Sequence, residues 1–183
     1  MQPPPVPPGR LVATTIATVQ LLSIAVWAGG LLALGAIVAP IVFRVVPAPT
    51  SADAMTLVFR RFDGVAIGCS VVALFAEAAF AFAPGRGRIT RADLARGGSL
   101  ALATALAITI GVWLSPAIAE LHRGGAVRHL GAAGQELERL HHLAEALAKG
   151  EMVLLVLAFG LGVFGLGVGR ASRPGPEADS PPP

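Results

Sequence analysis

The chain has 183 residues, of which 54% are hydrophobic and only 14% are charged. This composition fits a single bundle in lipid rather than a soluble domain. The net charge of +3 comes from bases that are scattered, with no aromatic platform between them. That distribution excludes nucleic acid as a partner and favours the lipid bilayer, with anionic headgroups as neighbours.

Four long apolar runs divide the chain. They lie between Arg10 and Arg44, Asp63 and Arg86, Arg96 and Glu120, and Glu151 and Arg170. A helix needs roughly 20 apolar residues to cross a bilayer, so each run is long enough. The sequence therefore predicts an all-α, four-transmembrane-helix bundle over residues 11–170, with spans at about 15–43, 65–84, 99–118 and 151–169. The Pro-rich segments 1–10 and 171–183 are predicted to be disordered tails.

Small residues recur at helical spacing in the first and last runs. The first stripe comprises Gly29, Ala33, Ala36 and Pro40, and the second comprises Ala158, Gly162, Gly165 and Gly169. Such stripes let helices approach closely in lipid. We expect them to hold the bundle together or to form contacts in a homo-oligomer. Pro40 lacks a backbone donor, so we expect the first helix to kink or end there.

The connector between the first two runs has an amphipathic pattern. Ser51 is a plausible N-cap, with Asp53 in the first turn. Apolar residues then recur three and four apart, at Met55, Val58, Phe59 and Phe62. With Arg60 and Arg61 close by, the pattern predicts a short interfacial helix on the headgroup surface.

Glu77 is the only ionisable group inside any of the four apolar runs. It shares a helical face with Ala66, Ser70 and Ala73, so it should point toward other helices. A carboxylate there costs at least a few kcal/mol unless it is paired, hydrated or protonated. Two interpretations stay open: a structural acid bonded across helices, and a proton-relay or cation-binding carboxylate. No opposite charge lies within the runs, although an Arg at a helix end could reach it.

Orientation is nearly undetermined by charge. With four spans, both termini and the 84–97 loop share one side, and each side carries seven Lys or Arg. Four Arg in that short loop favour cytoplasmic termini. The single Lys amid abundant Arg, Ala, Gly and Pro is typical of a GC-rich bacterial genome and hence of a bacterial inner (plasma) membrane.

All four histidines lie in the connector before the last run. Glu138, His141, His142 and Glu145 are three or four residues apart, a spacing that can present side chains to one metal ion, with His122 nearby. The same spacing describes ordinary pairs on a solvated helix face. Since the runs contain no His and enzyme motifs are missing, we expect no cofactor and no enzyme activity; a metal or haem at the histidines is the alternative.

The first half of the chain resembles a known family. The motif residues are Trp27, Gly29, Gly30, Pro40, Arg44, Arg60, Arg61 and Asp63, and His141, His142 and Leu143 match a later segment whose Ser is replaced by Ala144. They resemble the bacterial domain-of-unknown-function family related to transmembrane protein two-hundred-and-five, whose members are small four-span membrane proteins. The Trp–Ala–Gly–Gly segment is also similar to copper-resistance proteins and to a small membrane protoporphyrinogen oxidase, which carry a His in their spans.

Three functions remain open at this point. The preferred one is a non-enzymatic membrane protein that handles a small solute or metal stress, with Glu77 as its intramembrane polar centre. The second is a haem- or metal-binding redox protein that uses His141 and His142. The third is a structural or partner-binding bundle.

Overall fold

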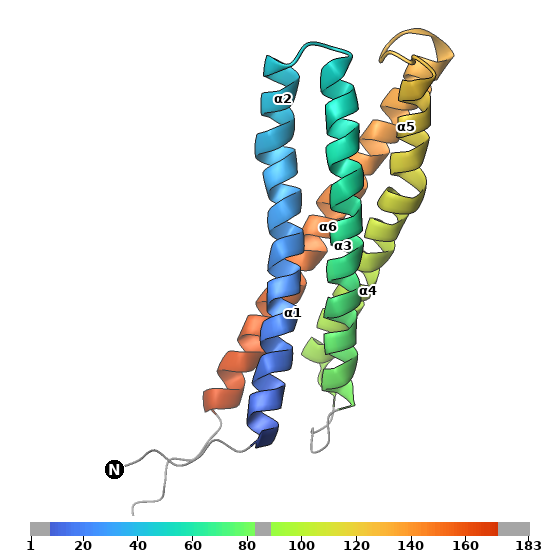
Figure 1. Ribbon diagram of the computed structural model, residues 1–183. Coiled ribbons are helices and arrows are strands. Elements are labelled where there is room, and N and C mark those ends of the chain that lie inside the picture. Colours follow the sequence, from blue (N-terminus) through green and yellow to red (C-terminus); the bar gives the residue numbers. More distant parts are fainter. Residues whose placement is uncertain (1–7, 83–88, 172–183) are drawn as a thin grey trace, which may run out of the picture.

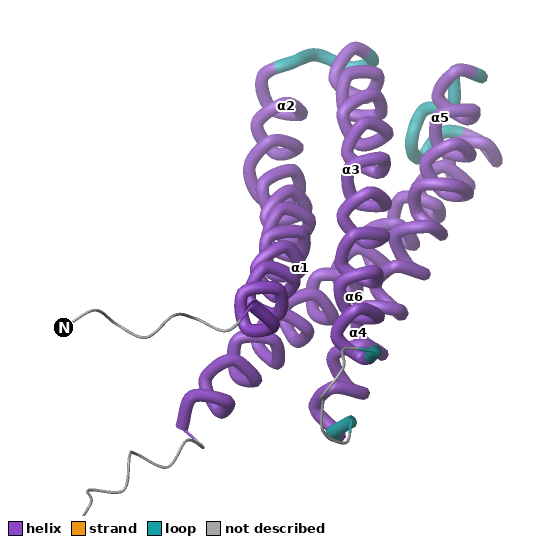
Figure 2. The backbone as a smooth tube through the Cα atoms, turned by 60° about the horizontal axis from the view of Figure 1, so that its bottom comes forward, coloured by secondary structure: helices purple, strands orange, loops and turns teal. Residues whose placement is uncertain are grey.

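The structure is a computed structural model that describes residues 8–82 and 89–171. Within these residues the chain is helical and contains no strand (Figure 2). The elements in order are α1 (Pro8–Ala33), the π-helical η1 (Leu34–Val38), α2 (Ala39–Val45), α3 (Thr50–Ala81), α4 (Arg91–Ile108), the π-helical η2 (Thr109–Leu114), α5 (Ser115–Arg123) and α6 (Gly131–Ala171). The all-α prediction is confirmed. Pro84 and most of both predicted tails lie outside the described residues.

The elements form four antiparallel columns (Figure 1). The first column, α1 to α2, leads away from the N-terminal end, α3 returns, α4 to α5 leads away again, and α6 returns. The closest packing is between α4 and α6 and between α1 and α3. Because α6 runs obliquely behind the others, it contacts α5 near one end and α1 near the other.

Each column is long and apolar enough to cross a membrane. The candidate spans are Leu11–Val45, Thr50–Ala81, Arg91–Arg123 and Gly131–Gly165, with 32 to 35 residues each. At 1.5 Å per residue they measure about 50 Å, which exceeds the ~30 Å hydrocarbon core. The four predicted spans are therefore confirmed as helices, but three of them are considerably longer than predicted. The prediction stopped at charged residues, whereas the helices continue past them toward the headgroups.

The predicted interfacial helix is not a separate element. Residues 50–63 form the first part of α3, which continues unbroken to Ala81. Pro49 occupies the N-cap position, so Ser51 is not the cap; its side chain is buried instead. Gly64 lies at the junction between the predicted interfacial helix and the second span. A single glycine destabilises a helix by only about 1 kcal/mol, so α3 continues through it. The last connector behaves in the same way, since α6 runs through Gly150 as one helix.

Two prolines follow π-helical segments. Pro40 is the second residue of α2 and follows η1, while Pro116 is the second residue of α5 and follows η2. Proline lacks an N–H and its ring clashes with the carbonyl four residues earlier, and a wider π turn relieves that clash. The first column therefore does not end at Pro40.

The packed centre of the bundle joins large side chains to alanines. Trp27, Leu100 and Leu155 are fully buried, and they pack with small residues such as Ala73 and Ala158. Dense packing of this kind replaces the missing hydrophobic drive for helix association in lipid.

The two small-residue stripes have different fates. In the first, Gly29, Ala36 and Pro40 are exposed, so they do not pack inside the monomer, and contacts in a homo-oligomer stay a prediction. In the second, Ala158 and Gly162 are buried. The glycine that packs in the first column is Gly30, because a Cβ there would overlap the Phe62 ring, whereas Gly29 has nothing within 4 Å.

Candidate functional site

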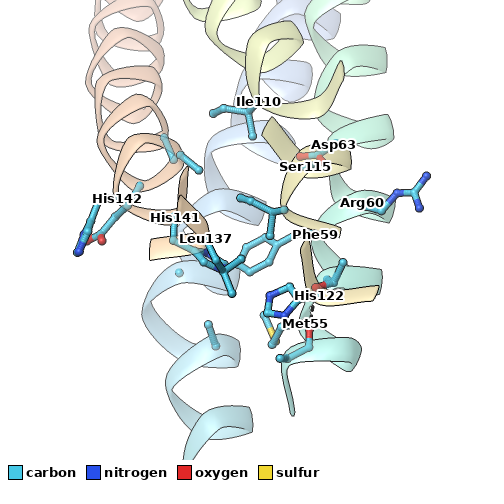
Figure 3. Close-up of a pocket in the computed structure, with 18 of the residues that line it drawn as sticks. Met55, Phe59, Arg60, Asp63, Ile110, Ser115, His122, Leu137, His141 and His142 are labelled. Atoms are coloured by element: carbon cyan, nitrogen blue, oxygen red, sulfur yellow. Dashed lines mark hydrogen bonds between the residues drawn. The ribbon is translucent and has the colours of Figure 1, made fainter. Parts of the chain in front are cut away.

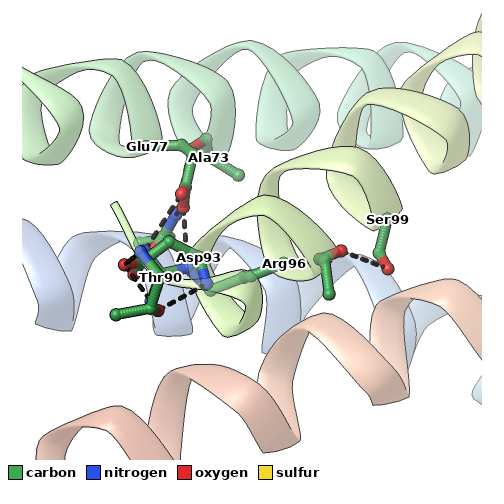
Figure 4. A network of polar contacts seen from close by, with 8 residues as sticks. Ala73, Glu77, Thr90, Asp93, Arg96 and Ser99 are labelled. Atoms are coloured by element: carbon green, nitrogen blue, oxygen red, sulfur yellow. Dashed lines mark hydrogen bonds and ion pairs between the residues drawn. The ribbon is translucent and has the colours of Figure 1, made fainter. Parts of the chain in front are cut away.

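Glu77 lies near the C-terminal end of α3, and both of its carboxylate oxygens accept hydrogen bonds (Figure 4). Arg96 binds Glu77 through two guanidinium nitrogens: Nε donates to Oε2 at 2.8 Å and Nη2 donates to Oε1 at 3.0 Å. From α1, Gln20 Nε2 donates to Oε2 at 2.7 Å. A bidentate pair with a third donor is a strong arrangement, and it joins α1, α3 and α4.

Arg96 is held in place by its own helix start. Thr90 and Asp93 form a capping box at the beginning of α4. Asp93 Oδ1 also lies 3.5 Å from Arg96 Nη2, and the Arg96 guanidinium sits 5.8 Å from the centre of the Phe80 ring. Glu77 does point toward other helices. The apolar runs contain no opposite charge, but Arg96, which bounds the third run, reaches Glu77, as the sequence allowed for an Arg at a helix end. Since α4 begins at Arg91, Arg96 lies inside the helix. This geometry favours a structural brace.

A cavity lies in the half of the bundle away from Glu77. It measures about 620 Å³ and is enclosed by the first column beyond Leu31, the first half of α3, the η2–α5 segment and the first half of α6. Apolar side chains dominate its wall, and Figure 3 shows Met55, Phe59 and Leu137 converging on it. A volume of this size is typical of small-molecule sites.

Glu151 is the most deeply buried charged group at this cavity, with 1% of its surface exposed. Trp27 Nε1 donates a short hydrogen bond of 2.5 Å to Glu151 Oε1. In the described part of the chain, Oε2 has no hydrogen-bond partner. Buried polar atoms are nearly always paired, so an open carboxylate oxygen at a cavity indicates a binding position.

Sequence reasoning missed Glu151 because this residue marks the boundary at which the fourth apolar run begins. A signal was nevertheless present. Seven positions of α6 that are buried or line the cavity alternate four and three residues apart: Leu137, His141, Ala144, Ala148, Glu151, Leu155 and Ala158. This is the spacing of one continuous helix stripe, and it places Glu151 and His141 on the inner face.

A second acidic side chain lies at the cavity wall. Asp63 Oδ2 accepts a hydrogen bond of 2.6 Å from Ser115 Oγ, which joins α3 to α5. Both residues line the cavity and are labelled in Figure 3. Asp63 belongs to the family motif, so this part of the resemblance falls on the site.

The histidine cluster separates into an inner and an outer group. The rings of His122 and His141 meet edge to face with centroids 5.8 Å apart, and His141 Nε2 is buried without a partner among the described residues. His142 is exposed on the outer side and lies 3.7 Å from Glu138, which pairs more closely with His129 (Figure 3). Glu145 bonds to Lys149 at 2.7 Å.

The predicted metal ligands therefore do not converge. Among residues 8–82 and 89–171, no group of three or more His, Cys, Asp or Glu side chains is arranged to hold a metal ion. The outer members of the cluster form helix-face pairs of the ordinary kind.

The other motif residues fall into two classes. Trp27 and Gly30 pack in the centre of the bundle, and Arg60 lies at the cavity. Gly29, Pro40, Arg44 and Arg61 are exposed and do not line the cavity.

The fold and the site define a multi-pass α-helical membrane protein with a buried ion-pair brace near one end and a cavity of small-molecule size near the other. The chain belongs to the family described as Domain of unknown function (DUF4149), which matches residues 22–126, more than half of its length. The match ends before α6, so Glu151 and His141 lie outside it. No curated protein and no solved structure matches the chain.

Proposed function

We propose that this protein handles a small, largely apolar solute, without converting it, by binding it in the cavity between α1–α2, α3, α5 and α6. The observation that carries the proposal is the open Oε2 of Glu151 at a cavity of about 620 Å³. Pockets that bind small molecules combine an apolar wall with a few fixed polar groups, and this cavity has both. Glu151 thus takes the role of polar centre, and Glu77 braces the helices.

The test compares two substitutions on α6. Ala144→Phe places a ring at the cavity wall, whereas Ala146→Phe adds the same ring at an exposed position of the same helix that does not line the cavity. Binding of the fluorophore N-phenyl-1-naphthylamine to the purified protein in mild detergent should have a saturable component that Ala144→Phe removes and Ala146→Phe retains. Equal saturable binding by both variants would refute binding in the cavity.

We also propose a bacterial inner membrane with cytoplasmic termini, and a relationship to transmembrane protein two-hundred-and-five. The support for this orientation is the four Arg residues between positions 86 and 96. The end of α3 and the start of α4 lie at the same end of the bundle as the start of α1 and the end of α6 (Figure 1). The cavity would then open toward the periplasm. The exposed stripe of Gly29, Ala36 and Pro40 offers a surface for a second copy of the chain.

A metal- or haem-dependent function is the second candidate, and the observation that favours it is the buried, unpartnered Nε2 of His141 beside His122. An absorption spectrum and elemental analysis of the purified protein test it. A Soret band, or a stoichiometric metal lost in His141→Ala, would establish it, and a clean negative result would leave solute binding.

A further inference from the structure

We propose that the solute bound in the cavity is an amphiphilic organic cation whose protonated amine pairs with Glu151. This inference rests on the proposed function and names the chemical class of its ligand.

The first support is the half-satisfied state of Glu151. One carboxylate oxygen is fixed by Trp27, which sets the direction of the other, and Oε2 lies buried without a partner in the described part of the chain. A carboxylate taken out of water is costly unless a charge and a hydrogen-bond donor compensate it. An ammonium group supplies both at once.

The second support is the balance of charge around the cavity. Among the described lining residues there are four carboxylates, from Asp63, Glu138, Glu145 and Glu151, against two guanidinium groups, from Arg60 and Arg128. Both arginines are exposed. Glu138 and Glu145 already bind His129 and Lys149. The inner end therefore presents the carboxylates of Asp63 and Glu151, which together favour a cation.

The third support is the chemistry of the wall, which suits an organic cation better than a metal ion. Metal sites need several oxygen, nitrogen or sulfur ligands, and no group of three or more His, Cys, Asp or Glu is placed for one in residues 8–82 and 89–171. Glu151 offers one open oxygen, while Phe59 and Phe62 also line the space. Aromatic faces attract organic cations, and the apolar wall can take a hydrocarbon tail.

The test uses Trp27 as a reporter. The chain has two tryptophans, and Trp113 is 68% exposed, so Trp113→Phe leaves Trp27 as the single emitter beside Glu151. In this background, decylammonium should change the Trp27 emission saturably, and it should bind at least about tenfold more tightly than the neutral probe 1-decanol, a difference of about 1.4 kcal/mol.

The key variant is Glu151→Gln, which keeps the size and leaves an oxygen for the Trp27 N–H. It should weaken decylammonium binding by at least about tenfold and leave 1-decanol unchanged. Glu136→Gln, which removes the carboxylate paired with Arg139 on the same helix and outside the cavity lining, is the control that should keep both affinities. If Glu151→Gln does not fold, the preference of the unsubstituted site for decylammonium over 1-decanol still decides the matter.

The outcomes separate the two proposals. Equal affinity for both probes, or decylammonium binding unaffected by Glu151→Gln, would overturn the cation while leaving solute binding intact. If neither probe gives a saturable signal and Ala144→Phe changes nothing, the proposed function fails as well.

Discussion

Two buried or half-buried carboxylates, Glu77 and Glu151, lie at different levels of the same bundle and differ in how they are compensated. Glu77 receives three hydrogen bonds from Gln20 and Arg96. Glu151 receives one from Trp27 and keeps an open oxygen. A fully paired acid holds helices together, whereas an acid with an open oxygen at a cavity is available to a ligand. The difference in partners, rather than burial alone, assigns them different roles.

Arg96→Gln tests the brace. The change leaves Glu77 without its charged partner in a site where the side chains are only 11% and 15% exposed. We expect a loss of about 1–3 kcal/mol in the free energy of unfolding, measured in mild detergent. Adding Glu77→Gln should cost less than it does in the unsubstituted protein, because the pair is already broken.

The matched control for the brace is Arg139→Gln, which removes an exposed pair with Glu136 on α6. Exposed pairs contribute little, so the unfolding transition should hardly move. Equal losses from Arg96→Gln and Arg139→Gln would contradict the structural role of the Glu77–Arg96 pair.

The two adjacent glycines of the first column provide a second test. Gly30→Ala would press a methyl group against the Phe62 ring, so we expect a loss of about 1–3 kcal/mol in stability. Gly29→Ala meets nothing within 4 Å and should be neutral or stabilising by up to about 1 kcal/mol. Thermal unfolding of both variants measures the difference, and a reversed order would disprove the packing role of Gly30.

At the scale of the elements, the columns keep their continuity where the sequence contains helix breakers. The π segments η1 and η2 carry the chain through Pro40 and Pro116, and both segments contribute residues to the cavity wall. π-helical turns occur frequently at functional sites, because they displace the residues that follow them. Their place beside the cavity agrees with the proposed binding role.

Thr90→Ala tests the start of α4. In the capping box, the Thr90 hydroxyl accepts a hydrogen bond from the backbone N–H of Asp93, and the Asp93 carboxylate accepts one from the backbone N–H of Thr90. Asp93 also approaches Arg96. We expect a loss of about 0.5–2 kcal/mol in the free energy of unfolding. Thr109→Ala is the comparison, since Thr109 bonds only to a carbonyl of its own helix and should matter less. A larger effect at Thr109 would be inconsistent with the capping role.

The fold was predictable from the apolar runs, because an uncharged stretch long enough to cross a bilayer must satisfy its backbone hydrogen bonds internally, and a helix does so within a single segment. The ends of the helices were not, since charged residues such as Arg60 and Arg96 are tolerated in helices that extend to the headgroups. For the same reason, the sequence did not identify which Arg pairs with Glu77. Glu151 was hidden because an acid beside an apolar run resembles a boundary until helix periodicity is followed across it.

At the scale of the whole molecule, the antiparallel columns separate two polar regions. The brace is on the side of the termini, and the cavity is on the side of the two connectors at residues 46–49 and 124–130 (Figure 1). Between them lies the packed centre around Trp27, Leu100 and Leu155. The two ends of the bundle therefore face different aqueous compartments.

Cysteine labelling tests this arrangement in a Cys69→Ser background. Ala48→Cys and Val127→Cys lie in the two connectors of the cavity end, so a membrane-impermeant maleimide should label both from the same side of the membrane. Ile89→Cys, 56% exposed in the unsubstituted protein and at the opposite end, should be labelled only from the other side. Labelling of all three from one side would contradict four crossings.

The packed centre limits how a bound solute could move through the protein. In the part of the chain that the structure describes, Trp27, Leu100, Leu155 and the alanines around them close the bundle below the cavity, with exposures at or near zero. A solute that binds in the cavity as proposed has no open path through this packed layer. Passage to the opposite compartment would require the Trp27 layer to separate, and the bond between Trp27 and Glu151 links that layer directly to whatever occupies the carboxylate.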